Sequence, residues 1–236
     1  MMATQLAMPR KGHMDAVYHI FAYLKQHHNA EMVYDPSDPM INMSDFQDKD
    51  WSTIVHGSDL KEILPDNMPE PRGHGMIMRA FVDADHASDS ITRRSRTGFI
   101  VILNAAPTYW FSKKQSTVET SSFGSEFVAM KQVTEYVRGL RYKMRMMGIS
   151  VLGPTYIYGD NQSVLFNTSV PESTLKKKSQ SICYHFVREG SARNEWKTGY
   201  INTKSNPADI LTKPLAARRR QDLIRAILHH LFEKVE

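Results

Sequence analysis

The sequence predicts an α/β fold: a five-stranded mixed sheet flanked by helices, with a small helix–strand appendage at the N-terminus. Two patterns predict it. Short apolar runs bounded by turn residues read as strands, and a long stripe of apolar residues between them has helical spacing. From residue 76 onward the elements follow the order strand, strand, strand, helix, strand, helix, helix, strand, helix.

Three short strands come first. Residues 76–83 read as a strand that stops at an acidic turn, and residues 97–103 form a nearly continuous apolar run, typical of a strand covered on both faces. Residues 104–107 turn the chain into a third, aromatic-rich strand at 108–111. Three strands in close succession indicate an antiparallel meander.

A long helix is predicted over residues 122–147, closed by Gly148. One glutamate and five apolar residues are spaced 4, 3, 4, 3 and 4 positions apart, so they share one face of this helix. They are Glu126, Met130, Val133, Val137, Leu140 and Met144. A carboxylate therefore opens the apolar face of this helix, so we expect Glu126 at the sheet side, near the edge of the sheet.

The remaining elements are shorter. A fourth strand is expected at 155–158, before Gly159 and Asp160, and a fifth at 199–202. Helices are expected at 161–167 and 181–192, and Pro207 is placed to open another. The first 35 residues read as a helix and a short strand at 31–34, residues 36–75 as an irregular connection, and residues 216–236 as an amphipathic helix.

Composition narrows the class of protein only slightly. The chain has 236 residues, of which 41% are hydrophobic and 23% charged, as in an ordinary globular protein. Its single cysteine, Cys183, excludes an internal disulfide. The net charge of +5 suits a nucleic-acid partner but is weak support alone. No apolar stretch is long enough to span a bilayer, so we expect no membrane partner.

Four acidic residues occupy the places where sites form in α/β sheets. Asp83 ends the first strand, Asp160 follows the fourth, and Glu126 and Asp209 lie on helices. Converging carboxylates repel one another unless cations bind them, and oxygen ligands suit Mg²⁺ or Mn²⁺. Two such ions about 3.5–4 Å apart can cleave a phosphodiester. Any one of these aspartates alone is more often a turn former, and Asp85 is a rival to Asp83, since one residue of register decides which faces the site.

Several motifs in order resemble the ribonuclease H domain of copia-type retrotransposons. They cover about residues 76 to 215: FVDADH at 81–86 with RRSRTG at 93–98, WFSKKQ at 110–115 with TVETSS at 117–122, YGDNQS at 158–163, YHFVRE at 184–189 and ADILTKPL at 208–215. Upstream, PRKGH at 9–13 and the helix that follows are similar to the end of a copia-type reverse transcriptase. The chain therefore resembles the C-terminal part of a longer polyprotein.

The resemblance implies four parts: a reverse transcriptase remnant at 1–35, a connection at 36–75, a ribonuclease H-like domain at 76–215 and the C-terminal helix at 216–236. It implies an endonuclease that cuts the RNA strand of an RNA–DNA hybrid during reverse transcription. Asp83, Glu126, Asp160 and Asp209 match the metal-binding acids for Mg²⁺ or Mn²⁺, and Asp209 would also assist product release. The expected partners are the hybrid and the reverse transcriptase of the same polyprotein. The expected location is intracellular, in the cytoplasm, with the nucleus or virus-like particles as alternatives.

Two departures from the family pattern stand out. Gly124 occupies a position where the family often has a second acid, and the segment at 176–180 lacks the histidine that the family often has there. The paired aspartates of a polymerase site are absent from the sequence, so we do not expect polymerisation.

Four further residues are candidates for substrate binding. Gln162 could bond a sugar hydroxyl, Lys113 and Lys114 could meet backbone phosphates, and Ser121 lies close to Glu126. The alternatives are a surface helix residue, a solvated strand end and a helix cap, respectively. The rival functions are a catalytically inactive nucleic-acid-binding or structural relic of a retrotransposon polyprotein and, with less support, a transposase or integrase of related fold.

Overall fold

The computed structural model describes residues 8–46, 48–54 and 61–230. The chain divides into two compact units, one formed by Met1–Val33 with Leu228–Glu236 and the other by Tyr34–Ile227. The larger unit contains the predicted sheet and all the candidate site residues.

The smaller unit contains α1 (Lys11–Gln26) and two short strands, β1 (Ala30–Glu31) and β9 (His229–His230). The strands pair antiparallel, with Ala30 opposite His230. The C-terminal helix predicted over 216–236 is therefore wrong in its extent. Helix α6 spans only Ala217–Arg225, because the backbone beyond it pairs with β1, a long-range contact that local periodicity does not reveal. The last six residues of that prediction lie outside the described residues.

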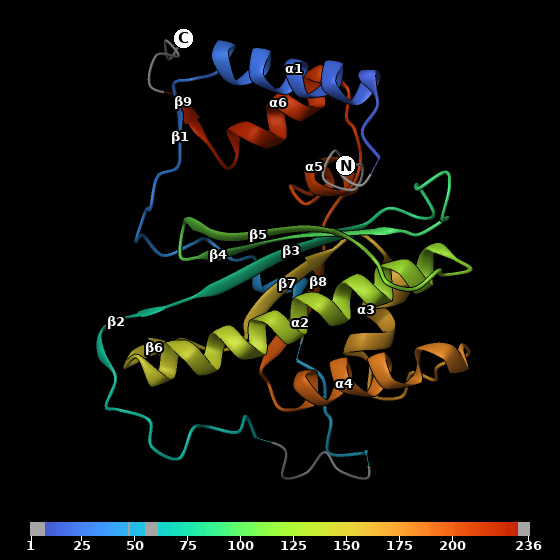
Figure 1. Cartoon of the computed structure of the whole chain (residues 1–236). Helices are drawn as coiled ribbons and strands as arrows, with labels where there is room; N and C mark the ends of the chain where they lie inside the picture. The colour runs from blue at the N-terminus through green and yellow to red at the C-terminus, as the bar shows by residue number, and fades with distance from the viewer. Residues whose placement is uncertain (1–7, 47, 55–60, 231–236) are drawn as a thin grey trace. The chain divides into compact units, whose positions relative to one another are not determined.

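The larger unit is built on a five-stranded mixed sheet with the order β5-β4-β3-β7-β8 (Figure 1). Strands β3, β4 and β5 form the predicted antiparallel meander, whereas β7 runs parallel to β3 and β8 parallel to β7. This confirms the predicted sheet, whose strands are β3 (Met78–Ala84), β4 (Arg96–Leu103), β5 (Ala106–Lys114), β7 (Thr155–Gly159) and β8 (Trp196–Tyr200).

Helices cover both faces of the sheet (Figure 1). On one face lie α2 (Ser122–Met146), α3 (Gln162–Ser169) and α4 (Ser181–Ala192). On the other, the short helix α5 (Asp209–Thr212) packs against β4 and β3. Strand β4 is buried from Thr97 to Val101, as expected for a strand covered on both sides. This arrangement confirms the predicted α/β class, a five-stranded mixed sheet flanked by helices.

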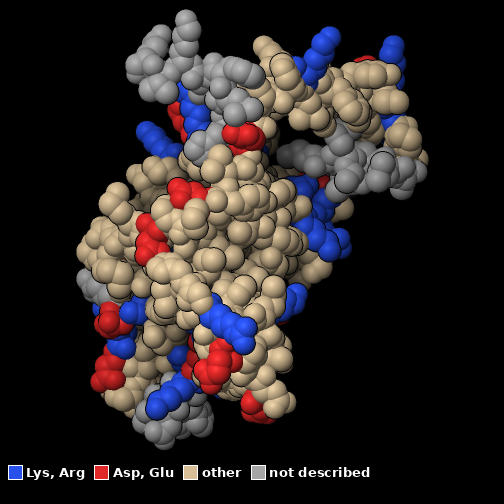
Figure 2. All heavy atoms as spheres, turned by 90° about the vertical axis from the view of Figure 1, so that its left-hand side faces the viewer, with Lys and Arg blue, Asp and Glu red and all other residues tan. Residues whose placement is uncertain are grey.

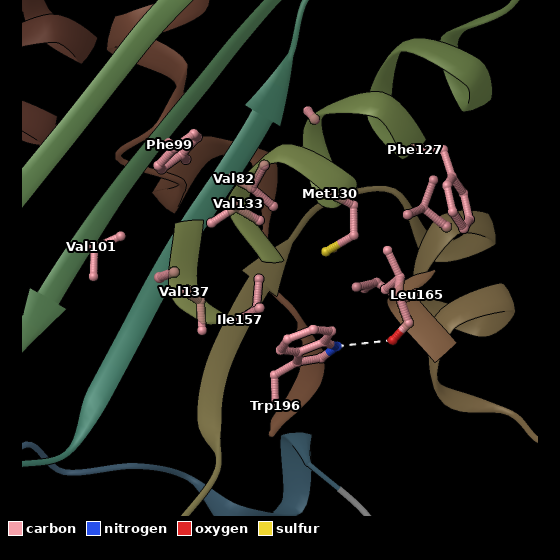
Figure 3. Packing of buried hydrophobic residues seen from close by; sticks show 14 of the residues in the cluster. Val82, Phe99, Val101, Phe127, Met130, Val133, Val137, Ile157, Leu165 and Trp196 are labelled. Atoms are coloured by element: carbon pink, nitrogen blue, oxygen red, sulfur yellow. Dashed lines mark hydrogen bonds between the residues drawn. The ribbon is translucent and has the colours of Figure 1, made fainter. Parts of the chain in front are cut away.

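The core lies between α2 and the sheet. Met130, Val133 and Val137 form the predicted helix stripe and point toward Val82 and Ile157 on the strands (Figure 3). Each is almost completely buried, and burial of such a side chain contributes about 1.5–3 kcal/mol. The apolar face of α2 therefore fixes this helix, and with it Glu126, against the sheet.

Tight packing also locks α4 onto the sheet. Trp196 of β8 is fully buried, and its indole Nε1 donates a hydrogen bond to the backbone oxygen of Val187 at 3.1 Å. A Cβ at Gly190 would lie 2.0 Å from the Trp196 ring, so only glycine fits at this crossing.

The connection at 36–75 is more ordered than predicted. It contains a short 3₁₀ helix, η2 (Met43–Asp45), and ends in β2 (Arg72–Met76), which pairs parallel with β6 (Ile149–Val151). Phe46 is buried on Tyr156 and Tyr158, and Gly199 leaves room for its ring. The sequence did not reveal these contacts, because they join segments that are far apart along the chain.

Charged residues also tie this connection to α2. The Glu62 carboxylate accepts hydrogen bonds from Arg141 and Arg145, both 2.7 Å at Oε2. Burial opposes ionisation of Glu62, but the two arginines outweigh it and lower its pKa. On the face shown in Figure 2, Lys and Arg side chains are interspersed with Asp and Glu. Among the described helices, none combines the length and apolar composition that a membrane crossing requires.

Candidate metal centre

Three of the four predicted acids meet at one edge of the sheet. Asp83 lies near the end of β3, Asp160 follows β7 directly, and Glu126 lies in the first turns of α2. One carboxylate oxygen from each lies within 4.8 Å of the others. The reason is that β3 and β7 are adjacent parallel strands in which Phe81 lies opposite Tyr158. Two residues further along each strand direction come Asp83 and Asp160, so the two aspartates lie side by side.

The structure separates Asp83 from its rival Asp85. The Asp83 carboxylate is 1% exposed, belongs to the three-acid cluster and accepts a hydrogen bond from the Thr212 hydroxyl. The Asp85 carboxylate instead accepts hydrogen bonds from the Arg96 backbone N–H and the Ser88 hydroxyl. Asp85 therefore closes the loop between β3 and β4 and is not part of the cluster.

The cluster strongly disfavours charge on Glu126. Burial raises the pKa of this carboxyl to about 9, and the negative charges of Asp83 and Asp160 add to the effect. The positive charge of Lys213 and the backbone N–H of Ala84 oppose it. Three carboxylates with such mutual repulsion are the donor set that a hard divalent cation prefers, so the residues present fit Mg²⁺ or Mn²⁺.

The fourth acid, Asp209, has different surroundings. Its side chain is fully buried on α5, and it is not in the three-acid cluster. Oδ1 lies 2.7 Å from the ammonium of Lys213, and Oδ2 pairs with the guanidinium of Arg219. The structure thus brings three predicted acids together and holds the fourth between two cationic side chains.

Close packing of α5 on the sheet sets the position of Asp209. A Cβ at Gly98, the residue opposite Asp83 on β4, would lie 2.7 Å from the Thr212 methyl carbon. The Ser112 hydroxyl donates to the backbone oxygen of Leu211 at 2.6 Å, and the Asn206 amide donates to that of Val82 at 2.9 Å. Glycine at position 98 therefore lets α5 approach the strand that carries Asp83.

A groove of about 930 Å³ opens beside the N-terminal ends of α2 and α3. The predicted residue Gln162 lines it, together with the exposed ring of Phe166 and the lysines Lys176 and Lys177. Asn161 contributes to this groove and caps α3 by accepting a hydrogen bond from the Val164 N–H at 3.2 Å. Asn161, which lines the groove, directly follows Asp160 in the chain.

The other predicted substrate-binding residues differ in whether their side chains are already engaged with other groups. The Ser121 hydroxyl caps α2, accepting a hydrogen bond from the Gly124 N–H at 3.2 Å, and it also bonds Lys177. Lys113 is exposed at the end of β5. The Lys114 ammonium is paired with Asp89, which leaves it less available for a phosphate.

At Gly124, where the family often has a second acid, the side chain of Glu119 occupies the adjacent space. A Cβ at Gly124 would lie 2.5 Å from Oε2 of Glu119, so that carboxylate occupies the space beside the helix. Gln180 holds it by donating from Nε2 at 2.7 Å. Residues 176–180 thus contribute both groove lysines and a positioning amide.

Sequence reasoning missed the residues that surround the acids. Thr212 and Lys213 lie in the ADILTKPL motif, but only their hydrogen bond and ion pairs reveal that they contact Asp83 and Asp209. The spacing of four residues between Asp209 and Lys213 was an available signal for an ion pair. Arg219 gave no comparable signal, because its contact depends on the turn between α5 and α6.

Comparison with known proteins finds similar segments in the polyproteins of plant transposons. The retrovirus-related Pol polyprotein from transposon RE2 of Arabidopsis thaliana is 30% identical over 156 residues, which is 66% of this chain. That from transposon TNT 1-94 of Nicotiana tabacum is 27% identical over 156 residues. The chain is homologous to the Pol polyproteins of copia-type transposons. This confirms the predicted resemblance.

The match covers a small part of these relatives, 11% of the RE2 polyprotein and 12% of the TNT 1-94 polyprotein. No family model matches the chain. Among solved structures, RNase H1 from Halobacterium salinarum NRC-1 is similar with a TM-score of 0.44 and 13% sequence identity, covering 57% of this chain and 93% of that one.

Proposed function

We propose that this chain is a metal-dependent endoribonuclease that hydrolyses the RNA strand of RNA–DNA hybrids during retrotransposon reverse transcription. The observation that carries the proposal is the cluster of Asp83, Glu126 and Asp160, whose carboxylate oxygens lie within 4.8 Å of one another at the edge of the sheet. Similarity to Pol polyproteins supports the proposed setting.

The chemistry follows from the cluster. A bound divalent cation would polarise a phosphodiester oxygen and lower the pKa of an attacking water. Asp83 and Asp160 would hold it as charged ligands, and Glu126 would join them after losing its proton. Mg²⁺ is the proposed ion, with Mn²⁺ as the substitute. In the two-ion form of this mechanism, Asp209 would help to bind the second ion.

The groove beside the cluster is the proposed path of the substrate. Gln162 would bond a sugar hydroxyl, and Lys176 and Lys177 would meet phosphates along the same groove. Lys113 and Ser121 would complete the contacts, while Lys114 would have to leave Asp89 to do so. Preference for a hybrid would come from duplex shape and from the 2′-hydroxyl, which only the RNA strand carries.

The rest of the proposal concerns the setting. The larger unit would act with the reverse transcriptase of the same polyprotein. Residues 1–35 would derive from the end of that polymerase, with residues 36–75 as the connection. We place the protein inside the cell, in the cytoplasm, with the nucleus or virus-like particles as other sites of action.

One observation favours a second candidate, an inactive relic that binds nucleic acid or has a structural role. Asp209 is fully buried and neutralised by Lys213 and Arg219, so it is not open to a metal ion in this conformation. A relic would still bind the hybrid through the groove but would not cut it.

Cleavage of labelled hybrid, duplex RNA and duplex DNA in Mg²⁺, Mn²⁺ or excess chelator tests the proposal. We expect cuts in the RNA strand of the hybrid alone, dependent on the divalent ion. The variant Asp160→Asn should abolish cleavage while the fold persists, because it removes a charged ligand and also relieves repulsion in the metal-free cluster. Binding without cleavage in either ion would establish the relic instead.

A further inference from the structure

Lys213 occupies an unusual position between two parts of the acid set. Its ammonium lies 2.7 Å from Oδ1 of Asp209 and 3.5 Å from Oδ2 of Asp83. Asp83 is a member of the three-acid cluster and Asp209 is not. A single positive charge therefore joins the cluster to the fourth acid.

The backbone directs this side chain. Lys213 ends α5, where its extended backbone (φ −144°, ψ 153°) leaves the helix. Its backbone N–H still donates to the Asp209 backbone oxygen at 3.3 Å, so the two residues are held together. The Lys213 side chain is 35% exposed, whereas Asp83 and Asp209 are 1% and 0% exposed. The lysine can thus move toward solvent, but the two aspartates cannot.

The contact with Asp209 is also incomplete. Oδ1 of Asp209 is fully buried and makes no hydrogen bond, although the Lys213 ammonium lies close to it. Charge attraction alone satisfies this oxygen. A ligand that approached from the cluster side could therefore bind Oδ1 without breaking an aligned hydrogen bond.

We propose that Lys213 occupies the second cation position of the centre, so that a second divalent ion binds only by displacing its ammonium group. The inference rests on the proposed function, in which a first ion binds Asp83, Glu126 and Asp160. The second ion would bind one oxygen of Asp83 and Oδ1 of Asp209, the two groups that Lys213 now joins.

Displacement is physically reasonable because a doubly charged ion replaces a singly charged one between two buried carboxylates. The exchange returns the ammonium to water through the exposed part of its side chain. Arg219 remains on Oδ2 of Asp209, so this carboxylate keeps a partner throughout. The lysine therefore lowers the affinity for the second ion more than it changes the affinity for the first, because it lies closer to Asp209 than to Asp83.

Calorimetric titration of the full chain with Mn²⁺ tests the inference without measuring hydrolysis. The wild type should show a tight first ion and a weaker second ion. In Lys213→Ala and in Lys213→Gln, which keeps most of the side-chain length, the second ion should bind at least about tenfold more tightly, and this gain should exceed any change in the first affinity.

The matched control is Lys204→Ala, which removes the same charge from an exposed position on the 3₁₀ helix Thr203–Ser205. It should leave both affinities unchanged. A double variant, Lys213→Ala with Asp209→Asn, should lose the gain in the second affinity, because the gain requires the Asp209 carboxylate. Thermal unfolding of each metal-free variant confirms that it is folded.

An unchanged or weakened second affinity in both Lys213 variants would overturn the inference, as would an equal gain in the Lys204 control. Failure of the proposed function has a different signature. If chelator does not affect cleavage of the hybrid by the wild type, or if no cleavage occurs, the enzyme proposal is wrong even where the two Mn²⁺ affinities respond to Lys213 as expected.

Discussion

Replacing Glu126 by glutamine should change how the stability of the metal-free protein depends on pH. In the folded chain, burial and the charges of Asp83 and Asp160 raise the pKa of Glu126 to about 9 from an ordinary value of 4.5. Between these two values the folded state holds a proton that the unfolded state releases. The free energy of unfolding therefore falls as pH rises through this window.

The change in the free energy of unfolding per pH unit has an upper limit, because Glu126 can bind at most one proton more in the folded state than in the unfolded state. A full difference of one proton changes the free energy of unfolding by about 1.4 kcal/mol per pH unit. We expect roughly half of that limit, about 0.7 kcal/mol per unit. From pH 6.5 to 8.5 the wild type should lose about 1.4 kcal/mol that Glu126→Gln keeps.

Urea unfolding in the presence of chelator measures this difference. Wild type and Glu126→Gln are compared at half-unit steps over that range, and the difference between the two curves removes titrations that they share, such as those of histidines. Glu135→Gln is a suitable control, because that carboxylate lies on the same helix in an exposed ion pair with Lys131. Parallel pH profiles for wild type and Glu126→Gln would refute the reasoning, since they would show that Glu126 is ionised in the folded, metal-free protein.

Three further predictions follow from the geometry. Asp83→Asn should weaken Mn²⁺ binding at least about tenfold, whereas Asp85→Asn should mainly lower stability through its loop; equal losses of Mn²⁺ affinity would contradict the separation of the two. Gly98→Ala should destabilise the fold by about 1–3 kcal/mol, because its Cβ would lie 2.7 Å from the Thr212 methyl carbon; an unchanged unfolding midpoint would show that α5 packs elsewhere. Binding to an uncleaved hybrid should weaken with salt, and the double variant Lys176→Ala, Lys177→Ala should reduce the log–log slope by about 1.8 if each lysine meets one phosphate; an unchanged slope would remove the groove from the proposed binding path.

The sequence by itself determined the local elements and the order in which they occur. Apolar periodicity predicted the meander, the long helix α2 and the parallel strands to within a few residues, because each pattern is set by neighbours along the chain. It also predicted that Asp83, Glu126 and Asp160 would converge, since strand ends and helix starts meet at one edge of an α/β sheet. These inferences needed only local spacing and the rules of sheet topology.

The tertiary structure alone decided which distant groups complete those elements. The burial of Phe46 on β7, the pairing of β2 with β6 and the pairing of β9 with β1 join segments far apart in sequence. The same holds for Asp209, which the sequence grouped with the other acids and the structure places between Lys213 and Arg219. Burial and ion pairing are properties of the three-dimensional surroundings, so a carboxylate in the right place along the chain does not by itself reveal which cation it binds.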